Sequence, residues 1–431
     1  MNELFDRRDF LAAALAAGAS AAIPSAANGR VPVAAYRNIR YARAVRFGPA
    51  IAVPLGSISA TAARGPVAPQ LPSRLAISMG QQPALAQTED CQRLSVYTPG
   101  RRGRRPVIVF LHGGAFVSGG GELPWYDGTA LAGEQDVVVV TVTYRLGALG
   151  FRLDQGSNGP SPGFTDQVAA LQWVRDHIAR FGGDPANVTL AGQSAGAASA
   201  VALCEWGHGG KLFHRMILMS GTRASASRAD GEAVARRFDA ALNQDPRRAP
   251  VAAILQAQHT LPASPSGLPA WQPVAPARPV PLNVDTLLGW TREDLSAHTL
   301  LAERKAPRPG EPLDRFRAAT RPMIERMTGL GREVAAAGRT AYLYSFDWNG
   351  PDTGLGNCHC IDLSFLFGDQ AAWRDAPMLA GVDWSDHARM SRSMRAQWAA
   401  FARSGSPAVP GGQSWQRLAT GQQPVPVTSL A

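Results

Sequence analysis

The chain has 431 residues, 45% of them hydrophobic, and a formal net charge of +10 at pH 7. This length is ample for a large buried core, so the fold does not depend on a disulfide scaffold. The charge comes almost wholly from arginine, since Lys211 and Lys305 are the only lysines. The basic residues are scattered apart from the cluster at 101–105. That cluster could be a polyanion patch, but no aromatic residues interleave with it, so we interpret it as a solvated loop before a strand and expect no nucleic-acid partner.

The first 27 residues resemble a targeting segment. Arg7-Arg8 precede Phe10-Leu11, an apolar run covers 12–23, and small residues at 25–27 form a cleavage pattern. This order predicts a signal peptide of the twin-arginine type, with an ordinary N-terminal helix as the alternative. We therefore expect the mature protein, 28–431, to be exported to the periplasm or beyond. The apolar run is shorter than the ~20 residues of a membrane-spanning helix, so stable membrane insertion is not expected.

The next segments carry weak patterns and then strong ones. Residues 36–49 and 71–87 are mixed and rich in Pro and Gly, which predicts an irregular N-terminal layer. Residues 107–111 and 137–142 are short, apolar on both faces and bounded by turn residues, as buried parallel strands are. Between 165 and 181 the apolar residues recur at steps of three and four, which predicts a helix capped by Thr165 and ended by the glycines at 182–183.

The rest of the chain alternates strands and helices. This alternation predicts an α/β fold with a mostly parallel sheet covered by helices on both faces, built as one domain over 28–431. The Pro- and Ala-rich stretch 261–281 is expected to be a long loop within that domain. The predicted strands are 188–191, 216–219, 286–288 and 341–346, and the predicted helices are 195–203, 313–337 and 386–403.

The motif Gly192-Gln193-Ser194-Ala195-Gly196 is a G-x-S-x-G pattern. It is a weak signal by itself, but here it lies between a predicted strand and a predicted helix, as a nucleophile elbow requires. The glycines are needed because the turn is sharp and a Cβ at either position would collide with a neighbouring element. The pattern therefore predicts Ser194 as the nucleophile.

A serine nucleophile needs a base to take its proton and an acid to orient that base. When the nucleophile lies on such an elbow, the acid and then the histidine follow it along the chain. Glu293 and Asp294 come after the strand at 286–288, and His359 lies in a loop after the strand that ends near Phe346. The order predicts His359 as the base and Asp294, or alternatively Glu293, as the acid.

The developing oxyanion needs backbone N–H groups that point at it. A strand at 107–111 runs directly into His112-Gly113-Gly114-Ala115-Phe116, where small residues let the backbone approach a substrate closely. We expect the donors to be the N–H groups of Gly114, Ala115 and Ala195, with Gly113 permitting the turn. A plain glycine turn would be the alternative without the elbow.

The four cysteines predict neither a disulfide framework nor a metal centre. Four cysteines in a chain of this length do not form a scaffold. Cys358-His359-Cys360 lacks the spacing of structural zinc sites, and no second ligand pair follows it. No metal centre is therefore expected.

With these residues assembled, the chain resembles the type-B carboxylesterase family, which includes the cholinesterases. The resemblance implies an α/β-hydrolase fold and hydrolysis of carboxylic esters without a cofactor, and it favours Asp294 over Glu293 as the acid. It extends over most of the mature chain. Its further motifs are Tyr36 to Phe47, Glu89-Asp90-Cys91, Thr143 to Gly147, Phe181 to Thr189, Asn357 to Asp362 and Trp398 to Arg403.

Four departures from the family pattern bear on substrate and structure. Gln193 stands where the family usually has Glu, and no Trp occurs between Pro69 and Cys91, where cholinesterases bind quaternary ammonium. Losing both an anionic and a cation–π partner argues against choline esters. Ala68 stands near the position of the family's cysteine partner, so Cys91 is expected to be a free, buried thiol. The intervals from Ser194 to Asp294 and on to His359 are short for the family, which predicts an open site.

These observations predict a serine carboxylesterase that acts on neutral, short-chain esters, with a small-molecule ester as its partner. A catalytically silent cholinesterase-like binding protein is one alternative. An acyltransferase or amidase that uses the same three residues is another, since one constellation serves several acceptors. The natural substrate, the stereopreference and the oligomeric state are left open.

Overall fold

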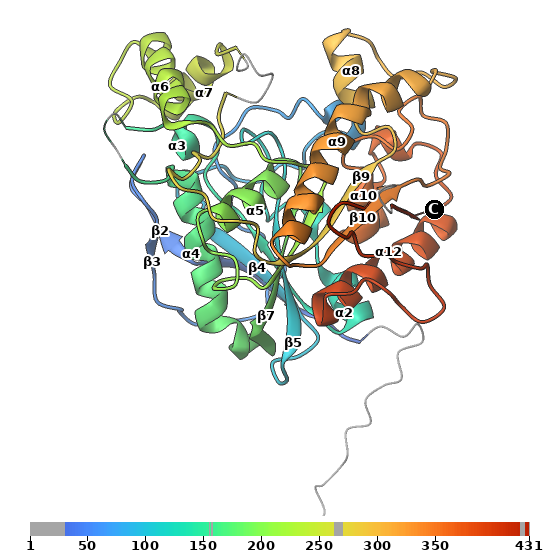
Figure 1. Cartoon of the computed structure of the whole chain (residues 1–431). Helices are drawn as coiled ribbons and strands as arrows, with labels where there is room; N and C mark the ends of the chain where they lie inside the picture. The colour runs from blue at the N-terminus through green and yellow to red at the C-terminus, as the bar shows by residue number, and fades with distance from the viewer. Residues whose placement is uncertain (1–30, 155, 157, 263–269, 423–426, 431) are drawn as a thin grey trace, which may run out of the picture.

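A computed structural model describes residues 31–154, 156, 158–262, 270–422 and 427–430. The predicted signal peptide, 1–27, lies outside these residues. The described chain forms a central sheet with helices on both faces (Figure 1). In the order in which they lie side by side, its nine strands are β1 (Ala34–Arg40), β4 (Arg93–Thr98), β6 (Val138–Val142), β5 (Arg105–Leu111), β7 (Gly183–Gln193), β8 (Arg215–Met219), β9 (Asp285–Thr291), β10 (Ala341–Phe346) and β11 (Thr428–Leu430).

The sheet is mostly parallel, as predicted. The strands from β6 to β11 pair in parallel, whereas β4 runs antiparallel to both β1 and β6. Strands β4 to β9 are buried almost throughout, and β5 and β6 are continuous apolar runs because helices cover both of their faces. A second, two-stranded sheet pairs β2 (Ala42–Arg43) with β3 (Ile51–Ala52).

The helices divide into two layers. One layer packs against β7 to β10 and contains α4 (Pro162–His177), α5 (Ala195–Glu205) and α9 (Asp314–Ala336). The opposite face is covered by α2 (Thr129–Gln135) and α12 (Trp384–Ser404), which contact β4 to β7. The remaining helices are α1 (Ala76–Met79), α3 (Gly147–Phe151), α6 (Arg228–Leu242), α7 (Val251–His259), α8 (Ser296–Ala302), α10 (Ile361–Leu366), α11 (Gln370–Trp373) and the 3-10 turns η1 (Pro124–Tyr126), η2 (Ile178–Phe181) and η3 (Pro377–Leu379).

Every strand and helix expected from the sequence is present, and two details of the prediction are wrong. Residues 36–49 and 71–87 are not all irregular, because β1 occupies the edge of the main sheet and the short helix α1 lies within the second segment. Thr165 does not cap α4: the N-cap is Ser161, and the Thr165 hydroxyl instead donates to the Pro162 carbonyl at 2.6 Å. The end of this helical region is as predicted, since Gly182 adopts a left-handed conformation with φ +76° after η2.

The state of Cys91 is as predicted, a free and buried thiol. All four are buried and free, so no disulfide links the described chain. Within the described ranges no helix is long and apolar enough to cross a membrane. The described part of 261–281 contains no helix or strand beyond an isolated bridge from Val274 to Ala226.

Candidate active site

Ser194 lies on a sharp turn between β7 and α5. Its backbone has φ 55° and ψ −119°, a strained conformation for a residue with a side chain. The turn is tied to the sheet because the Ser194 N–H donates to the Met219 carbonyl at the end of β8, at 2.8 Å. The structure therefore has the strand–turn–helix geometry that a nucleophile elbow needs.

The two glycines of the motif are required by close backbone approach. A Cβ on Gly192 would lie 2.3 Å from the backbone of Gly196. A Cβ on Gly196 would lie 1.9 Å from the Leu111 carbonyl oxygen at the end of β5. Real Cβ contacts are never this short, so only glycine lets α5 start directly against the sheet.

Asp294 follows β9 and is fully buried. Its Oδ1 lies 2.5 Å from Nδ1 of His359, and its Oδ2 accepts hydrogen bonds from the Ser220 hydroxyl at 2.5 Å and the Thr291 N–H at 3.1 Å. Burial acts to raise the pKa of Asp294, but the His359 charge and these hydrogen bonds outweigh it and lower the pKa. The carboxylate is thus kept ionised beside the imidazole.

His359 lies in the loop between β10 and α10, and it is only 4% exposed. The backbone N–H of His359 donates to the backbone carbonyl of Asp294 at 3.0 Å. This bond ties the His359 loop to the loop after β9. Burial acts to lower the pKa of His359, but the Asp294 charge and hydrogen bond, helped by the charge of Asp362, raise it overall. A raised pKa gives the ring the proton affinity that a general base needs.

Glu293, the alternative acid, points elsewhere. Its Oε1 pairs with Arg292 at 3.0 Å and Arg317 at 2.7 Å, and its Oε2 accepts the Asn357 N–H at 2.9 Å. The structure records no contact from this carboxylate to His359. Glu293 therefore holds the loop that precedes His359, while Asp294 is the carboxylate that contacts the ring.

The loop after β5 has the shape of an oxyanion-binding loop. Gly114, Ala115 and Phe116 have φ of 114°, 53° and 62°, so the backbone turns back toward the elbow. A Cβ on Gly114 would lie 2.1 Å from the Ser118 carbonyl oxygen, which only glycine avoids. The described residues supply no acceptor for the Gly114 and Ala115 N–H groups, and Ala195 starts α5, where N–H groups have no intrahelical partner.

His112 stands beside this loop but is structural. It is fully buried and stacks on Tyr144 with ring centroids 4.4 Å apart, and Tyr144 donates to its carbonyl at 2.7 Å. Burial lowers the pKa of His112 to about 4, so the ring is neutral at neutral pH. His112 thus braces the loop and takes no part in proton transfer.

One expected contact is missing from the site. Within the described chain, the Ser194 hydroxyl has no hydrogen-bond partner. Nε2 of His359, which should face that hydroxyl, instead lies 3.0 Å from Nε2 of the Gln193 side chain. The sequence showed that Gln193 departs from the family pattern, but its contact with the base is visible only in the fold.

Two further residues at the site escaped the sequence reasoning. Ser220 directly follows β8, and its place at a strand end next to β9 is the signal that could have identified it. His298, on α8, has its ring edge-on to His359 with centroids 4.9 Å apart, and it stands on the solvent side of the base. Desolvation by the surrounding protein, together with the charges of His359 and Arg74, lowers the pKa of His298, so the His298 ring is neutral at neutral pH.

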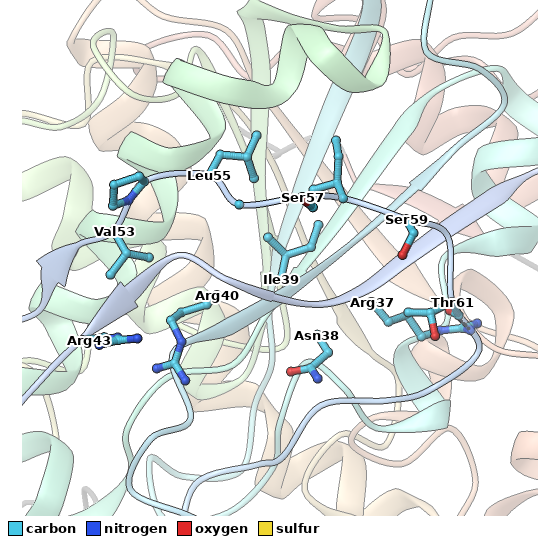
Figure 2. Close-up of a pocket in the computed structure, with 13 residues that line it drawn as sticks. Arg37, Asn38, Ile39, Arg40, Arg43, Val53, Leu55, Ser57, Ser59 and Thr61 are labelled. Carbon is cyan, nitrogen blue, oxygen red and sulfur yellow. Dashed lines mark hydrogen bonds between the residues drawn. The ribbon is translucent and has the colours of Figure 1, made fainter.

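A cavity of about 600 Å³ lies elsewhere, between β1 and the segment 53–61 (Figure 2). Two of its three arginines are engaged, since Arg37 pairs with Asp127 at 2.8 Å and Arg40 pairs with Asp90. The cavity contains none of the residues predicted for catalysis and offers no nucleophile next to a base. It is therefore not the reaction centre.

A family model, related sequences and solved structures resemble this chain over most of its length. A sequence model of the carboxylesterase family matches residues 21–274 and 322–430. The chain is 36% identical over 415 residues to a probable N-octanoylanthranilate hydrolase, AqdA2, of Rhodococcus erythropolis, covering 88% of this chain and 91% of that protein. It is 30% identical to a phenmedipham hydrolase of Pseudarthrobacter oxydans and 29% identical to a para-nitrobenzyl esterase of Bacillus subtilis, covering 80% of each chain in both comparisons.

Solved structures give the same result. A PNB esterase superimposes with a TM-score of 0.76 at 26% identity, over 91% of this chain and 90% of that one. The carboxylesterase EST55 of Geobacillus stearothermophilus superimposes with a TM-score of 0.74 at 29% identity, over 93% of each chain. The family match spans most of the sequence, and the fold is that of the α/β-hydrolases. The chain therefore belongs to the carboxylesterase family.

Proposed function

We propose that the protein hydrolyses neutral, short-chain carboxylic esters through an acyl-enzyme on Ser194. The observation that carries this proposal is the buried Asp294–His359 pair beside a serine on a strained elbow. The neutral side chain of Gln193 next to the nucleophile supports an uncharged substrate over a cationic one, because no carboxylate faces the substrate there. The short intervals between the three residues support an open site that favours small acyl groups.

In the first step, Oγ of Ser194 attacks the ester carbonyl carbon while Nε2 of His359 takes the hydroxyl proton. Asp294 stabilises the imidazolium that forms. The N–H groups of Gly114, Ala115 and Ala195 bind the oxyanion, each contributing about 3 kcal/mol to lowering the barrier. His359 then gives its proton to the leaving alcohol, the carbon–oxygen bond breaks, and water attacks the acyl-enzyme by the same route in reverse.

The test is turnover of p-nitrophenyl acetate and butyrate by the wild type and by Ser194→Ala. Loss of nearly all turnover in the variant is expected, and undiminished turnover would refute the proposal. An acyl-length series of aryl esters tests the open site, which should favour short chains without a sharp cut-off. A sharp optimum at a long chain would contradict that part.

Amide hydrolysis is a second candidate, supported by one observation. The relative that is 36% identical over most of its length is named for N-octanoylanthranilate, in which the acyl group is bound to nitrogen. Release of anthranilate from N-octanoylanthranilate, compared with release of p-nitrophenol from the octanoyl ester, distinguishes the two.

A silent binding protein is disfavoured because Ser194, Asp294 and His359 are all present. Labelling by a fluorophosphonate probe tests that alternative.

We propose export by the twin-arginine route, with residues 28–431 as one mature domain. The support is the order of Arg7-Arg8, an apolar run and a small-residue cleavage pattern in the sequence. An Arg7→Lys, Arg8→Lys double variant should remain in the cytoplasm while the wild type is found outside it. Equal export of the two proteins would refute the route.

A further inference from the structure

The two ring nitrogens of His359 have different partners. Nδ1 lies 2.5 Å from Oδ1 of Asp294, and Nε2 lies 3.0 Å from Nε2 of Gln193. A carboxylate only accepts, so Nδ1 carries the hydrogen of the neutral ring and Nε2 carries the lone pair. The Gln193 amide therefore donates to the same lone pair that must take the Ser194 proton.

Gln193 is held firmly in this position. It is the last residue of β7 and is 1% exposed. On one side its Oε1 lies against the oxyanion loop, where a Cβ on Gly113 would come within 2.5 Å of it. On the other side its amide also reaches the thiol of Cys360, next to His359, and that hydrogen bond acts to lower the thiol pKa, which burial raises overall. The side chain thus bridges the two loops that carry the oxyanion donors and the base.

We propose that Gln193 is a positioning residue that competes with Ser194 for Nε2 of His359 and keeps the ring neutral until bound substrate brings the hydroxyl into line. This inference rests on the proposed esterase function and adds to it. In the step it describes, the Gln193 N–H···Nε2 bond breaks and a Ser194 O–H···Nε2 bond forms. The proton then moves from Oγ to Nε2 as Oγ bonds to the carbonyl carbon.

The chemistry of an amide at this position differs from that of a carboxylate. A donor to Nε2 stabilises the neutral ring, whereas a carboxylate can only accept and would stabilise the imidazolium. Once Nε2 carries a hydrogen, Gln193 can bond to it only through Oε1, which requires the amide to turn. The amide therefore lets His359 act as a base at lower pH than a carboxylate would.

Other groups also face His359 and set the background for this effect. Asp294, after β9, and Asp362, on α10, favour the charged ring through their negative charges. His298, on α8, disfavours it, and Arg74 faces His298 in turn. None of these groups is altered by a change at position 193, so a shift in Gln193→Met reports on the lost amide, and a shift in Gln193→Glu reports on an added carboxylate.

The experiment measures kcat/KM for p-nitrophenyl butyrate against pH in the wild type, Gln193→Glu and Gln193→Met. In Gln193→Glu the acid limb should move up by about 1 pH unit or more, because a negative charge then adjoins the ring. In Gln193→Met, which keeps the length without the hydrogen bond, the limb should move up by less, and plateau kcat/KM should rise by up to about fivefold. The matched control is Gln167→Met, since Gln167 is buried and donates to the Ser199 hydroxyl at 2.9 Å away from the site. Its acid limb should stay where the wild type has it.

Unmoved acid limbs in both Gln193 variants, with circular dichroism and melting curves showing folded proteins, would overturn the inference. A lower plateau in Gln193→Met with an unmoved limb would also overturn it, since Gln193 would then serve packing alone. If Gln193→Glu fails to fold, the limb of Gln193→Met decides. Ser194-dependent activity with unmoved limbs refutes only the role of Gln193, whereas activity retained in Ser194→Ala refutes the proposed function and this inference with it.

Discussion

The hydrogen bond from Ser220 to Asp294 offers a sharp test of how the acid is held. The bond is 2.5 Å long and buried, and it is charge-assisted because the Asp294 carboxylate is ionised; such bonds contribute about 1.5–3 kcal/mol. The Ser220→Ala variant removes this donor and leaves Asp294 Oδ2 with only the Thr291 N–H. If the whole contribution were lost in the transition state alone, kcat/KM would fall about 10- to 150-fold.

The expected fall is about 10-fold, at the lower end, because the bond also exists in the resting enzyme and only its strengthening in the transition state affects the rate. Thermal unfolding should also occur at lower temperature, since a buried carboxylate loses a partner. The assay is kcat/KM on p-nitrophenyl butyrate together with a melting curve. Ser296→Ala is the matched control, because Ser296 is equally buried and donates to the Leu355 carbonyl at 2.7 Å. A Ser220→Ala enzyme within twofold of wild type would refute the reasoning.

Three further predictions follow from the site and its surroundings. Asp294→Asn should lower kcat by about 10⁴-fold, because the amide favours the wrong tautomer of the histidine. Glu293→Gln should lower stability and reduce kcat by less than about tenfold, and equal losses of kcat on p-nitrophenyl butyrate would contradict this assignment. Gly196→Ala should destabilise the fold by about 3 kcal/mol or more, since its Cβ would meet a strand carbonyl at 1.9 Å. Gly329→Ala on α9, whose added Cβ would have no atom within 4 Å, should stabilise the fold by about 0.5–1 kcal/mol; denaturant titration measures both changes. Burial raises the pKa of Asp362 to about 7, so the native state keeps a proton that the unfolded chain loses above about pH 4. The free energy of unfolding should therefore fall by about 4 kcal/mol between pH 4 and 7. Asp362→Asn should raise the melting temperature at pH 8 but not at pH 4, and equal melting temperatures of variant and wild type at pH 8 would contradict this prediction.

Local patterns predicted most of the fold. The strands at 107–111 and 137–142 are apolar on both faces, and such runs must be covered on both sides wherever they fold. The predicted helix 313–337 matches α9 (Asp314–Ala336) to within one residue at each end. Strands β1, β4 and β11 and the N-cap of α4 were missed. For the edge strands β1 and β11 and for the cap, the reason is that edge position and capping depend on neighbours that the local sequence does not name.

The candidate site, like the fold, was predicted in part from the sequence. Chain order and motif spacing are sufficient to nominate Ser194, Asp294 and His359 and the loop at 113–115, because an elbow and strand-end loops have sequence signatures. The family resemblance favoured Asp294 over Glu293, and the structure supplies the physical reason: Glu293 pairs with Arg292 and Arg317, which leaves Asp294 as the carboxylate on His359.

The sequence by itself determined the fold class, the family and the three candidate catalytic residues. The tertiary structure alone decided which partners those residues have: Ser220 on the acid, His298 beside the base and the Gln193 amide on Nε2 of His359. The physical reason is distance along the chain. His359 lies 166 residues from Gln193 and 65 from Asp294, and no local pattern encodes which side chains meet across such separations.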